Sequence, residues 1–352
     1  MLKDVRTAPP EYAPTNYWSV YEKKFVPELN QFGLKDFRKR QNSVLSSFGA
    51  TDLISSFDHI NLYSNIFFYN GFTRKIPFYT AFLTKLNKTF NTVLTSRVSE
   101  EKQYKKKKAS LDFASNTGKK AGAKHLESIE TSLVGNPEDV FEVNGKNYTR
   151  SFLYYYLRYV YCYPFVDFDK INTLVELGSG AGKQTEVLKK LYPHLTIILF
   201  DIPPQLYVCE RYLSTVFPDS VVSYKDTRDI KSLQNIEKGK IYILGTWQFP
   251  LLNDIKIDIF WNAASFQEME PDVVANYLKP IDKQADLVFL QEEMGGKEVA
   301  HKEGKFGVLK KTTLNDYKKS LSNFELVDLA PTLMPTGGNL PKSSDSFWRR
   351  KE

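Results

Sequence analysis

Residues 173–201 read TLVELGSGAGKQTEVLKKLYPHLTIILFD, and this stretch decides the fold of the chain. It holds two short apolar runs, one on each side of a glycine-rich turn, and an amphipathic helical pattern that Pro193 ends. Glycines let a backbone adopt positive φ and approach a ligand closely. The stretch therefore predicts a strand, a tight turn, a helix and a second strand, which is the βαβ unit of a parallel sheet.

The turn, GSGAG at 178–182, does not fit two common nucleotide-binding motifs. A Walker A loop needs Gly-Lys followed by Ser or Thr, whereas Lys183 is followed by Gln184. The dinucleotide motif G-x-G-x-x-G needs a glycine at Lys183 or at Thr185. What remains is an acid, three alternating glycines, and a second acid, Asp201, at the end of the next strand.

This pattern resembles the class I S-adenosylmethionine-dependent methyltransferases. The resemblance implies that the turn wraps the methionine part of the cofactor and that the second acid accepts the ribose hydroxyls, through charge-assisted hydrogen bonds. A plain βαβ unit without a cofactor is the alternative, but it leaves both acids unexplained. The cofactor-binding residues implied by this first part of the motif are Glu176, Gly178, Ser179, Gly180, Gly182 and Asp201.

Two further segments resemble the bacterial sugar O-methyltransferase family: NPEDVFEVNGK at 136–146 and SFQEM at 265–269. The resemblance covers roughly residues 126–329. It implies methyl transfer from S-adenosylmethionine to a hydroxyl of a nucleotide-linked or phosphorylated sugar, or of a glycan, for a surface polysaccharide. Two alternatives stay open. One is a small non-sugar acceptor, for which an aromatic helix predicted at 152–163 would line an apolar pocket; the other is a non-catalytic cofactor-binding scaffold subunit.

The chain as a whole predicts an α/β fold with two regions. Residues 169–352 should form a seven-stranded Rossmann-like sheet with helices on both faces. Residues 1–168 should form a mainly helical region that covers the acceptor and is a candidate homodimer surface. Within it we expect irregular structure over residues 1–20, several helices between 44 and 95, and an aromatic helix sandwiched between two layers.

The adenine contacts should follow the third strand, which we expect at 240–244. Thr246, Trp247 and Gln248 come next, so that Trp247 would stack on the base and Gln248 would bond its edge. A purely structural role for Trp247 is the alternative. If the third strand were instead the run at 221–224, Asp226 would take the adenine contact.

A sugar hydroxyl is a poor nucleophile while it is protonated, so the reaction calls for a general base. The candidates lie in the loops after the fourth and fifth predicted strands: Glu268, Glu270, Glu292, Glu293 and His301. Glu268 is the first choice because it lies in the SFQEM motif, although an acid there could also serve the amino end of the next helix. Glu268 with Glu292 or Glu293 could hold a divalent metal, but no spacing demands one.

The overall composition excludes several classes of protein. Two isolated cysteines support neither a disulfide framework nor a zinc site. The net charge of +7 is mild and includes the run at 105–108, which is more typical of a solvated face than of nucleic-acid binding. The sequence shows no signal peptide and no membrane span. We therefore expect a cytoplasmic protein without a nucleic-acid partner.

Overall fold

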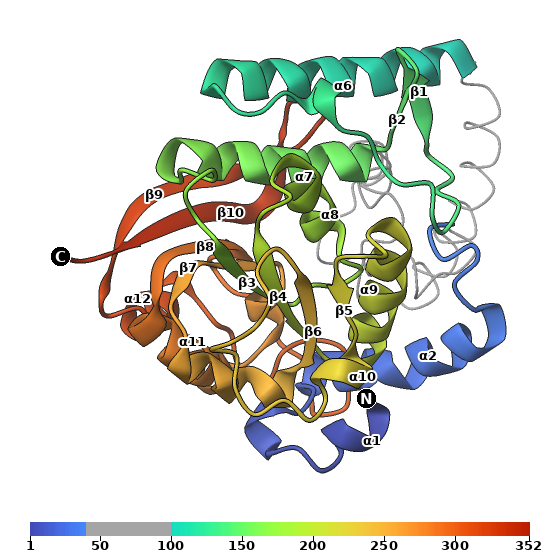
Figure 1. Ribbon diagram of the computed structural model, residues 1–352. Coiled ribbons are helices and arrows are strands. Elements are labelled where there is room, and N and C mark those ends of the chain that lie inside the picture. The colour runs from blue at the N-terminus through green and yellow to red at the C-terminus, as the bar shows by residue number, and fades with distance from the viewer. Residues whose placement is uncertain (40–99) are drawn as a thin grey trace.

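The centre of the molecule is a twisted sheet with helices on both faces (Figure 1). The computed structural model describes residues 1–39 and 100–352, so the helices expected between 44 and 95 lie outside the described residues. The strand order is β5-β6-β4-β3-β7-β8-β10-β9. The bounds are β3 Thr173–Leu177, β4 Thr196–Asp201, β5 Val221–Val222, β6 Ile241–Gly245, β7 Ile257–Ala263, β8 Ala285–Glu293, β9 Phe324–Leu333 and β10 Asn339–Arg350.

The predicted βαβ unit at residues 173–201 is confirmed. β3 and β4 pair in parallel, and α8 (Lys183–Leu191) connects them. The six neighbouring strands β5, β6, β4, β3, β7 and β8 pair with one another in parallel. β10 is antiparallel to both β8 and β9. Because parallel strands end at one edge, the side chains that follow β3, β4, β7 and β8 gather there.

The α/β fold is therefore as predicted, but the expected seven strands were one too few among the described residues. β5 has only two residues, a run too short for an alternating pattern to appear in the sequence. β10 lies in the proline-containing tail, where Pro341 and a run of serines hide the strand pattern. β6, and not β5, lies beside β4. The third strand is therefore the one predicted at 240–244, and not the alternative at 221–224.

Two layers of helices cover the sheet. On one face lie α6 (Glu100–Ala121), α7 (Arg150–Cys162), α8 and α9 (Pro203–Val216); on the other lie α11 (Pro271–Gln284) and α12 (Leu314–Ser320). A short hairpin, β1 (Phe141–Val143) with β2 (Lys146–Tyr148), turns at Asn144 and Gly145, both at positive φ. This is the turn that an Asn-Gly pair favours.

The aromatic helix predicted at 152–163 is α7, and it is sandwiched as expected. Ten of its thirteen residues are buried, and it packs between α6 and the layer formed by α8 and the sheet (Figure 1). The helix begins where the Thr149 hydroxyl accepts a hydrogen bond from the Phe152 amide. Its buried tyrosines keep hydroxyl partners: Tyr159 bonds Tyr192 at 2.7 Å. Burying each large apolar side chain contributes about 1.5–3 kcal/mol.

The expectation of irregular structure over residues 1–20 was wrong. α1 (Leu2–Val5) and α2 (Asn16–Phe32) lie there, and Gly33, at a φ of 62°, ends α2. The prolines that suggested an irregular chain all precede Asn16, apart from Pro27 inside the helix. A proline does not block a helix that starts after it.

Candidate active site

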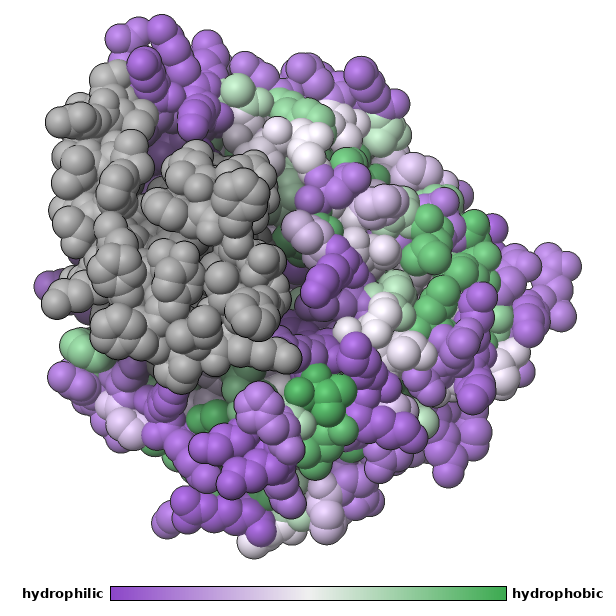
Figure 2. Space-filling view, turned by 180° about the vertical axis from the view of Figure 1, so that it is seen from behind, coloured by the Kyte–Doolittle hydropathy of each residue, from purple (hydrophilic) through white to green (hydrophobic). Residues whose placement is uncertain are grey.

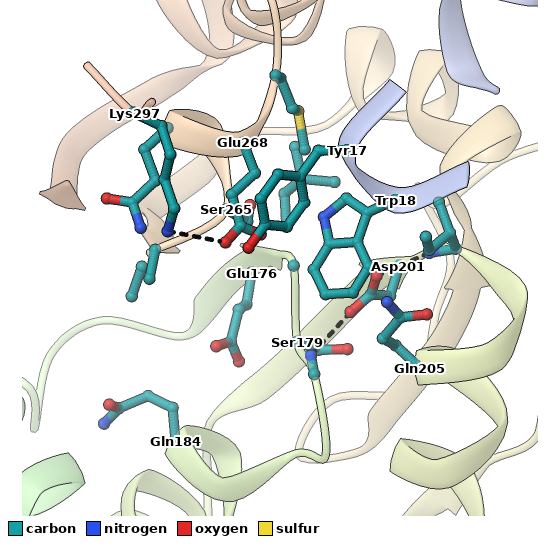
Figure 3. A pocket seen from close by; sticks show the side chains of 18 of the residues that line it. Tyr17, Trp18, Glu176, Ser179, Gln184, Asp201, Gln205, Ser265, Glu268 and Lys297 are labelled. Carbon is teal, nitrogen blue, oxygen red and sulfur yellow. Dashed lines mark hydrogen bonds and ion pairs between the residues drawn. The ribbon is translucent and has the colours of Figure 1, made fainter. Parts of the chain in front are cut away.

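One cavity of about 510 Å³ opens at the carboxyl ends of β3, β4, β7 and β8, within the size range of small-molecule sites. The glycine turn and Asp201 form its floor, and α2 and α7 supply opposite walls. Figure 3 shows Tyr17 and Trp18 of α2 facing the side chains at the ends of the strands, among them Asp201 and Glu268. The predicted residues that line the cavity are Glu176, Gly178, Ser179, Gly180, Asp201, Thr246, Glu268 and Glu293.

The glycines of the turn are required by its geometry. Gly178 has a φ of 81°, and a Cβ placed on it would lie 2.4 Å from the Ser265 hydroxyl. Gly182 has a φ of 75°, caps the start of α8, and packs against Leu213; it does not line the cavity. Gly178 therefore lets the turn pack closely against Ser265, whereas Gly182 serves the packing of the helix.

Asp201 is a buried carboxylate at the end of β4. Its two oxygens accept hydrogen bonds from the backbone amides of Gly180 (2.7 Å) and Ile202 (2.8 Å). Burial nevertheless raises the pKa of Asp201 to about 7. A carboxylate oxygen has two lone pairs, so each oxygen can still accept a hydroxyl proton from a ligand.

Thr246, Trp247 and Gln248 follow β6, but only Thr246 lines the cavity. The Gln248 side chain is used inside the protein: its oxygen accepts from the Gly245 amide and its nitrogen donates to the Thr227 carbonyl. The Trp247 ring packs over Gly245 and meets Tyr224 edge-on. Both side chains thus have structural partners that explain their positions.

The opposite end of the cavity holds an acidic and basic cluster. Glu268, in the short helix η7 (Phe266–Glu268), is buried and lies 3.2 Å from the Lys297 amine, which is itself 3.6 Å from Glu293. Burial raises the pKa of Glu268, and Lys297 and a hydrogen bond from Tyr17 oppose that rise. Figure 3 shows Tyr17 and Lys297 on either side of the Glu268 carboxylate.

Glu292 and His301 lie outside the cavity lining. Glu292 accepts a hydrogen bond from the Gln267 amide, and the Gln267 side chain in turn accepts from the Glu293 amide, which fixes the loop after β7 on the end of β8. His301 is exposed. In residues 1–39 and 100–352, no three His, Cys, Asp or Glu side chains come together in a way that could hold a metal ion.

The aromatic wall that α2 contributes to the cavity was not predicted from the sequence. Tyr17, Trp18 and Tyr21 line the cavity; Tyr17 reaches Glu268, and Trp18 lies beside Asp201 in Figure 3. α2 is fastened by Thr15, whose hydroxyl donates to the Glu268 carbonyl. The only available signal was the spacing of large aromatic residues after Asn16, which is typical of a helix.

Residues 161–227 match a family model described as an O-methyltransferase domain. The matched segment spans β3, α8, β4 and α9, and so includes the glycine turn and both acids. This part of the chain resembles an O-methyltransferase domain. No curated protein matched the chain in a sequence search.

Comparison with solved structures found many similar chains, and the three described here are distant. Mitomycin 7-O-methyltransferase MmcR is 13% identical, with a TM-score of 0.36 over 55% of this chain and 57% of that one. Magnesium protoporphyrin IX methyltransferase from Synechocystis PCC 6803, with bound SAM, is 12% identical, with a TM-score of 0.34 over 53% and 72%. The O-methyltransferase NcsB1 from neocarzinostatin biosynthesis is 12% identical, with a TM-score of 0.35 over 53% and 51%.

The cavity fits S-adenosylmethionine in its chemistry. Besides Asp201, three buried side-chain oxygens on its wall, those of Ser179, Gln184 and Gln205, lack a hydrogen-bond partner among the described residues. Buried acceptors are usually satisfied, so these oxygens are suited to the donors of a ligand.

Proposed function

We propose that the protein is an S-adenosylmethionine-dependent O-methyltransferase that acts on a sugar hydroxyl. The observation that carries this proposal is the arrangement of one cavity with Asp201 and the glycine turn at one end and a buried carboxylate, Glu268, at the other. The cofactor supplies an electrophilic methyl group. The protein's task is to orient the acceptor oxygen and take its proton, and orientation alone can contribute about 7–11 kcal/mol.

In this proposal Asp201 holds the ribose hydroxyls, and Glu176, Gly178, Ser179 and Gly180 surround the methionyl part. Glu268 is the general base. A base must be unprotonated, and Lys297 at 3.2 Å favours the ionised carboxylate against the effect of burial. Tyr17 donates to the same carboxylate and orients it. Glu293 is the alternative base, because it also lines the cavity beside Lys297.

The acceptor end combines flat aromatic rings with polar groups. Tyr17, Trp18 and Tyr21 present rings, and Gln267 and Glu268 present hydrogen-bonding atoms. A sugar offers apolar C–H faces and many hydroxyls, which suits such a mixed wall. The resemblance of the SFQEM segment to sugar O-methyltransferases supports the same acceptor class. A scaffold without catalysis would have no use for a buried carboxylate facing the cavity.

A small non-sugar acceptor, such as a phenol, is the second candidate. Apolar residues on the cavity wall favour it, among them Met269, Val273 and Met334. The described part of the wall also holds two cations, Arg158 and Lys297, of which Lys297 is engaged by Glu268 and Glu293. The sugar stays the first candidate because the wall combines aromatic rings with hydrogen-bonding groups.

The test is incubation with labelled S-adenosylmethionine and a panel of sugars, glycosides, sugar nucleotides and phenols. We expect label in an ether of a sugar or glycoside. Glu268→Gln should lower turnover by about 10²–10⁴, the usual size of a general-base contribution, with cofactor affinity retained. Transfer to phenols alone would establish the second candidate. A wild-type protein that binds no cofactor by calorimetry would refute the proposed function.

A further inference from the structure

The wall of the cavity beneath α7 holds a buried cation that the proposed reaction does not use. Arg158 is 8% exposed and lines the cavity. Its guanidinium carbon lies 4.6 Å from the ring centre of Tyr154 and 4.8 Å from that of Tyr155. In the described part of the chain, no carboxylate comes within ion-pair distance of it. A buried charge without a counter-ion is costly, so this arrangement calls for a ligand anion.

The Arg158 side chain is held in a fixed orientation. Its Nε donates to the Gln291 side-chain oxygen at 2.7 Å, and the Tyr154 hydroxyl donates to the same oxygen. The Gln291 nitrogen donates to Asp345, which also accepts from the Thr332 hydroxyl at 2.8 Å. Three strands and α7 thus fix one edge of the guanidinium at the wall of the cavity.

A buried carboxyl group shares this wall. Glu176, at 4% exposure, lines the cavity, and only the Thr185 hydroxyl bonds its side chain in the described part. Leu174 packs in the same hydrophobic cluster as α7, and side chains two apart on a strand share a face, so Glu176 also points toward α7. Burial raises the pKa of Glu176 to about 8, and the charge of Arg158 opposes that rise.

Glu176 and Arg158 therefore act on one another electrostatically without forming an ion pair. A ligand that carries an ammonium and a carboxylate on one carbon would satisfy both. S-adenosylmethionine ends in such a group. Glu176 lies one residue before Leu177 and the glycine turn, where the methionyl part is expected, and Gln184 ties α8 to α7 by donating to the Tyr155 carbonyl.

We infer that Arg158 binds the α-carboxylate of the cofactor's methionyl group, across from Glu176, which faces its α-ammonium. This inference rests on the proposed function, because it assumes the same cofactor in the same cavity. It makes the wall of α7 a subsite for an amino-acid zwitterion, and it makes Gln291 and Asp345 positioning residues for the arginine.

The test compares two ligands that differ in this group. S-adenosylhomocysteine carries the amino-acid end, and 5′-methylthioadenosine lacks it. By calorimetry, Arg158→Met should weaken the binding of S-adenosylhomocysteine by about 10- to 100-fold, the size of a charge-assisted hydrogen bond. The same variant should change the affinity for 5′-methylthioadenosine by less than about threefold. Arg158→Lys should recover part of the loss. Lys297→Met, the matched removal of the other cavity cation, should leave the ratio of the two affinities unchanged.

If Arg158→Met weakens the binding of both ligands equally, the inference is overturned and Arg158 has a structural role. Unchanged binding of both, with a raised acceptor KM, would assign the arginine to an anionic acceptor instead. Should Arg158→Met fail to fold, the affinity of the wild-type protein for decarboxylated S-adenosylmethionine is measured instead. An affinity equal to that for S-adenosylmethionine itself would overturn the inference. A wild type that binds none of these ligands refutes the proposed function itself.

Discussion

Lys297 lies between two carboxylates at the acceptor end of the cavity, and its charge sets the protonation of the proposed base. It lies 3.2 Å from Glu268 and 3.6 Å from Glu293. Burial raises the pKa of Glu268, and Lys297 counteracts this. Neither the pair nor its effect could be read from the sequence, because 29 residues separate the two partners and no spacing rule joins them.

Lys297→Met should move the acid limb of the pH–kcat/KM profile to higher pH. Without the cation, the pKa of Glu268 rises further, so a higher pH is needed to keep the base unprotonated. Steady-state rates between pH 5 and 9 measure the shift. Lys302→Met removes an exposed charge from the same loop and should leave the limb in place. Identical profiles for the two variants would exclude Lys297 as the controlling charge.

The buried carboxyl group of Glu292 should make the stability of the protein depend on pH. Burial raises its pKa to about 8 from an ordinary value of 4.5, and one of its oxygens has no partner in the described part. The folded protein keeps this proton up to about pH 8, whereas the unfolded chain releases it above about pH 4.5. Stability therefore falls as the pH rises through that window.

Glu292→Gln is neutral at every pH and removes this contribution. Relative to wild type, its free energy of unfolding should be higher at pH 7.5 than at pH 5, by about 1–3 kcal/mol. Urea unfolding at the two pH values measures the difference. Glu325→Gln, which removes an exposed carboxylate on β9, should show no such dependence. A Glu292 variant that differs from wild type equally at both pH values would contradict the assignment.

At the scale of elements, α2 and the loop at 295–312 together close the acceptor end. The Asn16 side chain makes three contacts with this loop: its nitrogen donates to the carbonyls of Lys305 (2.9 Å) and Gly307 (2.8 Å), and its oxygen accepts from the Gly304 amide (2.7 Å). The rings of Tyr17 and Tyr21 pack on Phe306. The wall is thus built from two segments far apart in the chain.

Asn16→Ala should loosen this wall without unfolding the protein. Each lost hydrogen bond contributes about 0.5–1.5 kcal/mol, so we expect acceptor KM to rise by about 5- to 50-fold and the loop near Gly304 to be cleaved faster in limited proteolysis. Asn253→Ala is the matched control, because among the described residues the Asn253 side chain bonds only the nearby Pro250 carbonyl. Unchanged KM and unchanged cleavage would show that α2 does not depend on this contact.

The elements that the sequence predicted best are those with local signals. β3, α8 and β4 follow from the glycine turn and the apolar runs, and α7 follows from its aromatic residues. β10 and α2 were missed because their evidence is not local: β10 is stabilised by pairing with β8 and β9, and α2 by docking on a distant loop. The same holds for the site, where Asp201 and Glu268 follow motifs but Tyr17 and Arg158 do not.

At the scale of the whole molecule, the core has two sides, one under α7 and α8 and one under α11 and α12. The coloured surface in Figure 2 is mostly hydrophilic, with small separate hydrophobic groups. Among the described residues, no helix is both long and apolar enough to cross a bilayer. Three expectations from the sequence stay predictions. They are a domain boundary at residue 168, a homodimer through the amino-terminal helices, and a cytoplasmic location. Sedimentation of the purified chain would test the homodimer.

The docking of α2 also has a consequence for biosynthesis. The Thr15 hydroxyl bonds the Glu268 carbonyl, 253 residues later in the chain. At a translation rate of about 5–20 residues per second, roughly 13–50 s pass between the synthesis of the two partners. During that time, the aromatic face of α2 has no loop to pack against. α2 leaves the ribosome well before this loop and is thus among the last segments to reach its final place.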